Sequence, residues 1–273
     1  MDDTQRFGGT WTVQKLEAVE RYLSAYTQAL KNLPFKLCYI DAFSGSGNVT
    51  LKDGTVVEGS ALRALKYPFN QYYFFEKNIS HSIALREKIN ANFTEKCDII
   101  NIVNDDCNKH FQNIDTFGWN AQNWRGVIFL DPYAMQFPWS SLETISKTRV
   151  FDVWYLFPFL AVNRNLPVSG EISQANEDTV TKIFGSSDWK DCIYTKSLQQ
   201  QLWGDDGWEK SSVDGIKEYI LGRLRSVFCA VSPNAAILRN QNNSPLFLLC
   251  FAMNNPSAAA QKLSLKIADH LLK

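Results

Sequence analysis

Short apolar runs alternate with segments of helical periodicity through residues 12–157, and this alternation limits the fold more than any other feature. The apolar runs are LCYIDAF (37–43), YYFFE (72–76), IINIV (99–103), GVIFLD (126–131) and FDVWYLF (151–157). The helices expected around them cover 12–31, 60–66, 78–92, 107–117 and 138–147. Strands that are apolar throughout and separated by helices form a parallel sheet with both faces covered. We therefore predict an α/β fold with a doubly wound, mostly parallel sheet.

The second half of the chain departs from this alternation. Residues 158–210 are largely polar and contain one expected short helix, near 176–184, so we interpret 160–210 as an insertion or lid. A long helix is expected over 211–229 and a last one over 256–272. Between them, AAILR (235–239) and PLFLLCFAM (245–253) flank a turn-rich stretch, which predicts an antiparallel hairpin. We expect residues 1–273 to form a single domain.

Composition and charge exclude several classes of protein. The 28 basic residues balance the 28 acidic ones, which excludes binding of nucleic acid through bulk positive charge but leaves a local basic groove possible. The first residues lack the pattern of a signal peptide, and no apolar stretch reaches the ~20 residues that span a bilayer. We therefore expect a cytoplasmic protein with no membrane contact. The six cysteines form no CxxC pair, so we predict no metal site.

The first candidate site is the loop DAFSGSG, which follows the first apolar run. Asp41 closes the strand, and Gly45 and Gly47 allow a ligand to approach the backbone, because they carry no Cβ atom. The loop lacks the Gly-Lys-Ser/Thr of a P-loop, and Thr50 replaces the third glycine of GxGxxG. We assign Asp41, Phe43, Ser44, Gly45 and Gly47 to the binding of a nucleotide-like cofactor.

Acidic residues also follow the second and third apolar runs. Glu76 ends YYFFE, where a carboxylate can accept hydrogen bonds from both hydroxyls of a ribose. Asp105 and Asp106 follow IINIV, and a carboxylate there can accept a hydrogen bond from the amino group of adenine. Either residue can serve, and we prefer Asp105 because it stands nearer the strand end. The carboxyl ends of parallel strands share one edge of the sheet, so these residues are expected to lie close together.

The fourth apolar run ends in Asp131-Pro132-Tyr133, which we interpret as the catalytic loop. Proline fixes the backbone and offers no amide hydrogen. Asp131 and a nearby main-chain carbonyl can accept hydrogen bonds from an amine, and the ring of Tyr133 can stack on a planar substrate. A proline-containing turn with a tyrosine in the core is the alternative.

Taken together, DAFSGSG, FFEKN, NDDC and FLDPYA resemble the motifs of class I S-adenosylmethionine-dependent methyltransferases. More narrowly, the chain resembles the bacterial three-Cys-motif partner proteins, through YIDAFSGSG, GSALRAL (59–65), FLDPYAM (129–135), FDVWYLFP (151–158) and IFGSSDW (183–189). The resemblance implies S-adenosyl-L-methionine as cofactor and a partner protein that carries three cysteines. It also makes Lys15 a candidate, because in these families the first helix lies across the cofactor site; a surface lysine on the polar face of that helix is the alternative.

A looser resemblance connects the chain with the ribosomal-RNA adenine-N6 methyltransferases that carry a DPPY motif. It covers only Asp131, Pro132 and Tyr133, since the second proline is absent here. Three hypotheses follow. The first is a methyltransferase for an amino group of a nucleic-acid base, in RNA or DNA. The second is a methyltransferase for a protein or small molecule that acts with a dedicated partner. The third is a cofactor-binding module without turnover.

Overall fold

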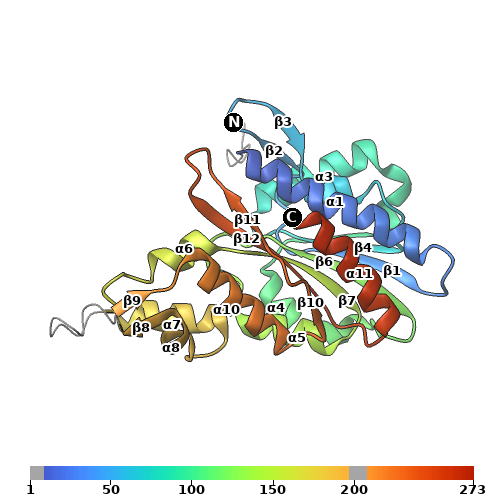
Figure 1. Cartoon of the computed structure of the whole chain (residues 1–273). Helices are drawn as coiled ribbons and strands as arrows, with labels where there is room; N and C mark the ends of the chain where they lie inside the picture. Colours follow the sequence, from blue (N-terminus) through green and yellow to red (C-terminus); the bar gives the residue numbers. More distant parts are fainter. Residues whose placement is uncertain (1–8, 197–207) are drawn as a thin grey trace.

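A mostly parallel sheet forms the centre of the molecule (Figure 1). The computed structural model describes residues 9–196 and 208–273. The five parallel strands are β1 (Lys36–Asp41), β4 (Gln71–Phe75), β5 (Ile100–Val103), β6 (Trp124–Leu130) and β7 (Phe151–Phe157). They lie within two residues of the five apolar runs of the sequence, which confirms the predicted α/β class.

The C-terminal hairpin completes this sheet on the β7 side. Strand β12 (Pro245–Met253) pairs antiparallel with β7, and β10 (Ala230–Val231) and β11 (Ala236–Arg239) pair antiparallel with β12. The resulting order is β10-β12-β7-β6-β1-β4-β5, with β11 also beside β12. The predicted hairpin is therefore confirmed, and its longer strand lies inside the sheet rather than at its edge.

Helices cover both faces of the sheet, as the alternation predicts. One face carries α1 (Thr10–Leu30), α2 (Ser60–Ala64), α3 (Ile79–Asn92) and α11 (Ala258–Leu271). The other face carries α4 (Cys107–Phe111), α5 (Trp139–Lys147) and α10 (Val213–Arg225). Successive residues of β7 alternate between the two cores, with Val153 and Tyr155 on one side and Trp154 and Leu156 on the other. Apolar residues on both faces of one strand are what two helical layers require.

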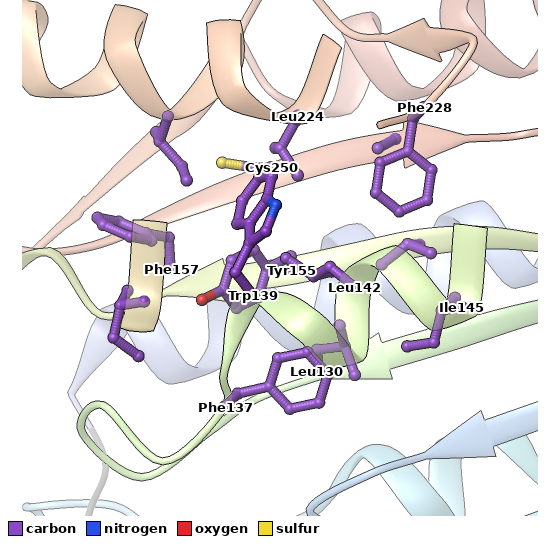
Figure 2. Close-up of a cluster of buried hydrophobic side chains, with 14 of the residues drawn as sticks. Leu130, Phe137, Trp139, Leu142, Ile145, Tyr155, Phe157, Leu224, Phe228 and Cys250 are labelled. Atoms are coloured by element: carbon purple, nitrogen blue, oxygen red, sulfur yellow. The ribbon is translucent and has the colours of Figure 1, made fainter. Parts of the chain in front are cut away.

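Trp139 at the start of α5 occupies the middle of the larger core (Figure 2). The close-up shows its indole between Leu224 of α10, Cys250 of β12 and the β7 side chains Tyr155 and Phe157. All five residues are at most 1% exposed. Burial of this many large side chains fixes α5 and α10 against the sheet.

The helix predicted near 176–184 is confirmed, but the prediction that it is the only helix of 160–210 is wrong. The described part of 160–210 contains α6 (Phe159–Arg164), α7 (Gln174–Phe184), α8 (Trp189–Ile193), β8 (Tyr194–Lys196) and β9 (Trp208–Lys210), while 197–207 lies outside the described residues. Because this region is largely polar, its sequence shows little sign of the apolar residues that hold it to the core. Four of them are at most 1% exposed: Val180, Ile183, Phe184 and Trp189. The described part of 160–210, the predicted insertion, therefore packs into the larger core.

Two further segments differ from the predictions. The helix expected over 107–117 is interrupted, because α4 is followed by a separate 3₁₀ turn at Ile114–Phe117. Another 3₁₀ segment, Thr94–Ile99, precedes β5. A small hairpin of β2 (Asn48–Thr50) and β3 (Val56–Glu58) follows the glycine-rich loop and was not predicted. Its signal was Asp53-Gly54, a dipeptide typical of tight hairpin turns.

Across residues 9–196 and 208–273, no helix combines the length and apolar character needed to cross a membrane.

Candidate active site

A cavity of about 560 Å³ opens where β1, β4, β5 and β6 end. This size is within the range of small-molecule sites, ~300–1,000 Å³. Its wall includes residues that follow each of the four strands: Phe43, Glu76, Asp105, Asp106, Asp131, Pro132 and Tyr133. The parallel strands therefore bring together most of the predicted site residues. These come both from the predicted cofactor-binding set and from the predicted catalytic loop.

The glycine-rich loop forms the β1 side of the cavity, with Phe43 on the wall. Gly45 and Gly47 have φ values of 62° and 89°, which L side chains rarely adopt. Ser44 holds the loop against β4, since its backbone N–H and its hydroxyl both donate to the carbonyl of Phe75, at 3.0 and 3.1 Å. Ser44, Gly45 and Gly47 shape the loop but do not themselves line the cavity.

Asp41 lies beneath this loop and not on the cavity wall. Its side chain is fully buried, and Oδ1 accepts a hydrogen bond from the backbone N–H of Phe43 at 3.2 Å. Burial raises the pKa of this carboxyl to about 7. The position suits a residue that supports the loop, so the predicted direct contact of Asp41 with a cofactor is not favoured by this geometry.

Glu76 connects the glycine-rich loop with the start of α3. Its Oε2 accepts from the N–H of Gly45 at 2.9 Å, and its Oε1 accepts from the N–H of Asn78 at 2.7 Å. Asn78 in turn caps α3 by accepting from the N–H groups of Ser80 and His81. The Glu76 side chain is 12% exposed and lines the cavity, so its carboxylate is held at a defined point on the wall.

Asp105 and Asp106 both line the cavity, with different partners. Asp105 accepts from Lys109 Nζ at 2.8 Å and lies 3.3 Å from His110 Nε2; the hydrogen bond from Lys109 is the main cause that lowers its pKa to about 2. Asp106 caps α4, because its Oδ1 accepts from the N–H of Asn108 at 3.0 Å. Since both carboxylates reach the cavity, the preference for Asp105 at an adenine stays a prediction.

Asp131, which follows β6, contacts Lys15 of α1. Lys15 Nζ forms an ion pair and hydrogen bond with Asp131 Oδ2, and their side chains are 8% and 24% exposed. Within the described residues, Oδ1 of Asp131 has no hydrogen-bond partner. Lys15 is therefore part of the site and not a surface lysine, and it leaves one carboxylate oxygen of Asp131 available to a ligand.

Tyr133 presents its ring at the mouth of the same cavity. It is 67% exposed, and the neighbouring Ala134 has a φ of 51°, in the left-handed region. The alternative of a core tyrosine is therefore wrong. An exposed ring beside a carboxylate suits stacking on a planar group.

The residues that line the cavity without having been predicted include Trp11, Phe247 and Arg164. Trp11 and Phe247 pack together with ring centroids 4.8 Å apart, and Lys15 Nζ lies 5.0 Å from the Trp11 ring centroid. Arg164, at the end of α6, adds an exposed cation from the insertion. No local sequence pattern identifies these three residues as site residues. They come from α1, the C-terminal hairpin and the predicted insertion, which only the tertiary structure brings together. Among the described residues, no cluster of His, Cys, Asp and Glu could hold a metal ion.

The sheet order and the site together define the class of fold. Five parallel strands in the order β7-β6-β1-β4-β5, extended by the antiparallel β12, with a glycine-rich loop after β1 and an acidic residue after β4, make up the class I methyltransferase fold.

Comparisons with known proteins find likeness among solved structures alone. No family model matches the chain, and no curated protein does. Among solved structures, protein LPL1258 from Legionella pneumophila has a TM-score of 0.52 at 13% identity, with 97% of this chain and 93% of that chain covered. A spermidine synthase in complex with a transition-state analogue has a TM-score of 0.46 at 12% identity, over 95% of this chain and 63% of that one. Protein SMU.1697c from Streptococcus mutans, solved with SAH, has a TM-score of 0.42 at 14% identity, over 88% and 97%. The likeness to the Legionella protein shows a shared fold.

Proposed function

We propose that this chain is an S-adenosylmethionine-dependent methyltransferase that acts on an amino group of a nucleic-acid base. One observation carries the proposal: a single cavity joins Glu76, the Asp105–Asp106 pair and the Asp131–Tyr133 loop. The first two suit an adenosine-containing cofactor and the third suits a planar amine. A cofactor and its substrate must share a cavity for direct group transfer.

The residues present fit the cofactor. Glu76 would accept from the ribose hydroxyls, and Asp105 or Asp106 from the adenine amino group. The loop that ends β1 has the positive φ angles of Gly45 and Gly47, so its backbone curves without a Cβ at these two points. The bound cofactor would supply a methyl group on a sulfonium, which is already electrophilic.

Asp131 would orient the amine that receives the methyl group. Its Oδ1 can accept one N–H, while Lys15 holds Oδ2 through an ion pair and hydrogen bond. A second acceptor, such as a main-chain carbonyl of the loop, would favour a tetrahedral amine whose lone pair is no longer delocalised into the ring. The methylated amine can lose its proton to solvent water after the transfer, so no separate general base is required. The exposed ring of Tyr133 would stack on the base.

The partner and the compartment belong to this proposal as well. We infer RNA or DNA as the substrate, a cytoplasmic location and, from the sequence resemblance, a partner protein with three cysteines. A protein or small-molecule substrate, and binding without turnover, are the alternative outcomes of the test below.

The test is transfer of labelled methyl from S-adenosylmethionine into RNA, DNA and protein fractions, with and without candidate partner proteins. We expect label in a nucleic-acid fraction, and a loss of about 10²–10³ in rate for Asp131→Ala with nearly unchanged cofactor affinity by calorimetry. Label in protein alone would replace nucleic acid as the substrate. No cofactor binding by the wild-type chain would refute the methyltransferase proposal, and a wild-type rate for Asp131→Ala would refute the role of the loop.

A further inference from the structure

A second cavity, of about 320 Å³, lies at the opposite edge of the sheet from the candidate active site. It opens between α1 and α11, which Figure 1 shows side by side on one face, and it reaches the second residue of β6 and of β7. Its walls are mainly apolar and include Leu30, Leu33, Phe35, Met253, Leu263 and Ile267. We refer to it as the α1–α11 cavity.

A buried carboxylate, Asp152, forms part of this cavity. Asp152 interrupts the apolar strand β7 and is only 4% exposed. The hydroxyl of Tyr22 donates to its Oδ2 at 2.5 Å, and the hydroxyl of Ser264 donates to the same oxygen at 3.3 Å. Within the described residues, Oδ1 of Asp152 accepts no hydrogen bond. Fully buried side-chain atoms without a hydrogen-bond partner occur elsewhere in the protein, but Oδ1 is not one of them, so it keeps some contact with solvent. One oxygen of Asp152 is therefore available from the cavity.

The nearby cation, Arg125, acts on Asp152 through its charge but forms no ion pair with it among the described residues. Arg125 also lines the cavity, but its Nη1 donates to the carbonyls of Ala121 and Trp124, at 2.5 and 2.7 Å. Its guanidinium lies 4.0 Å from the ring centroid of Phe35. None of the ion pairs among the described residues joins Arg125 to Asp152. A buried carboxylate without a cationic partner is unfavourable, and a bound cation would supply one.

We propose that the α1–α11 cavity binds a small organic amine, with its apolar part between the two helices and its ammonium group donating to Asp152 Oδ1. The apolar walls would desolvate the body of the ligand, and the carboxylate would provide a charge-assisted hydrogen bond. The hydroxyls of Tyr22 and Ser264 hold Oδ2, so the remaining oxygen has a defined position. This inference does not depend on the proposed methyltransferase activity.

The test uses 2-phenylethylamine as the probe and calorimetry of the full chain as the measurement. We expect binding to the wild type and at least tenfold weaker binding of 2-phenylethanol, which has the same shape without the charge. Asp152→Asn should lose the preference for the amine. Ala260→Phe, which adds a ring to the cavity wall but leaves Asp152 in place, should weaken both probes. Far-ultraviolet circular dichroism of each variant checks that it is folded.

A matched control separates this cavity from the candidate active site, which also holds carboxylates. Asp131→Ala should bind 2-phenylethylamine as the wild type does, because Asp131 lines only the first cavity. Equal affinity for the amine and the alcohol, or unchanged amine binding by folded Asp152→Asn, would overturn the proposal. So would loss of binding in Asp131→Ala, and so would failure of the wild type to bind the amine.

The pH dependence gives an independent readout of the same contact. Burial raises the pKa of Asp152 to about 7. The titratable groups that face it are Tyr22, Tyr26 and Cys229, and burial raises their pKa values too, so they stay neutral. Arg125 also faces Asp152 and stays charged. Amine affinity should therefore increase severalfold between about pH 6 and about pH 8 as Asp152 ionises. A flat profile would overturn the assignment of the ammonium to Asp152.

Discussion

Asp152 is expected to make the protein less stable as the pH rises, which is the reverse of the behaviour of a salt-bridged aspartate. Burial raises its pKa from 3.8 to about 7, so between these values the folded chain binds a proton that the unfolded chain has lost. The stability associated with this proton is complete below pH 3.8 and is lost as the pH rises through about 7. Asp152→Asn removes the titrating group and retains an amide oxygen that can accept from Tyr22.

The magnitude follows from the pKa. A rise from 3.8 to about 7 corresponds, at ~1.4 kcal/mol for each tenfold change in acidity, to about 4 kcal/mol. The free energy of unfolding of the wild type relative to Asp152→Asn should therefore fall by up to about 4 kcal/mol between pH ~4 and pH ~8. The variant should be the more stable protein, relative to the wild type, at the higher pH. Groups that titrate in both proteins, including buried Asp41, cancel in this difference.

Urea unfolding at several pH values measures this difference, because the free energy in water follows from the linear dependence on denaturant. Asp178→Asn is the matched control: its carboxylate is exposed on α7, so its relative stability should not change with pH in the same way. Parallel stability curves for the wild type and Asp152→Asn over this range would refute the reasoning. They would mean that Asp152 is solvated well enough to remain ionised in the folded protein.

Four further predictions concern the candidate active site. Glu76→Ala should weaken S-adenosylmethionine binding by about 1.5–3 kcal/mol in calorimetry, the range for a hydrogen bond to a charged group, and unchanged affinity would remove Glu76 from the site. Lys15→Met should reduce methyl transfer at least tenfold while cofactor affinity changes little, because Asp131 loses its cation; equal losses in both would contradict a positioning role. Tyr133→Ala should weaken substrate binding by about 1–3 kcal/mol and Tyr133→Phe should not, if stacking is the contact. Gly47→Ala should destabilise the fold more than Gly54→Ala in urea unfolding, since both have positive φ but only the Gly47 Cβ would meet Leu85 and Leu62, at 3.1 and 3.3 Å.

Much of the fold was predictable because the signals are local. A strand buried on both faces is apolar at nearly every position, and β7, with all seven residues buried, shows this in its composition apart from Asp152. Local signals fail where polar residues dominate, as in the insertion. There, Val180 and Trp189 reach the core from helices that have few other apolar residues.

The sequence by itself determined which residues stand at the strand ends. Glu76, Asp105 and Asp131 follow three parallel strands that are consecutive in the sequence. Because parallel strands end at one edge of the sheet, the topology alone predicts that these three residues lie near one another. Gly45 and Gly47 were predicted from the sequence as points where a ligand can approach the backbone, and the structure adds that both have positive φ.

Only the tertiary structure decided which side chains meet. Lys15 and Asp131 are 116 residues apart, and their contact depends on where α1 crosses the sheet, which long-range packing sets. The same packing of α1 against α11 creates the cavity around Asp152. Asp41 is buried, whereas Glu76, at the end of the neighbouring strand, lines the candidate active-site cavity. Periodicity records which face of an element is apolar, but not which distant residue that face will meet.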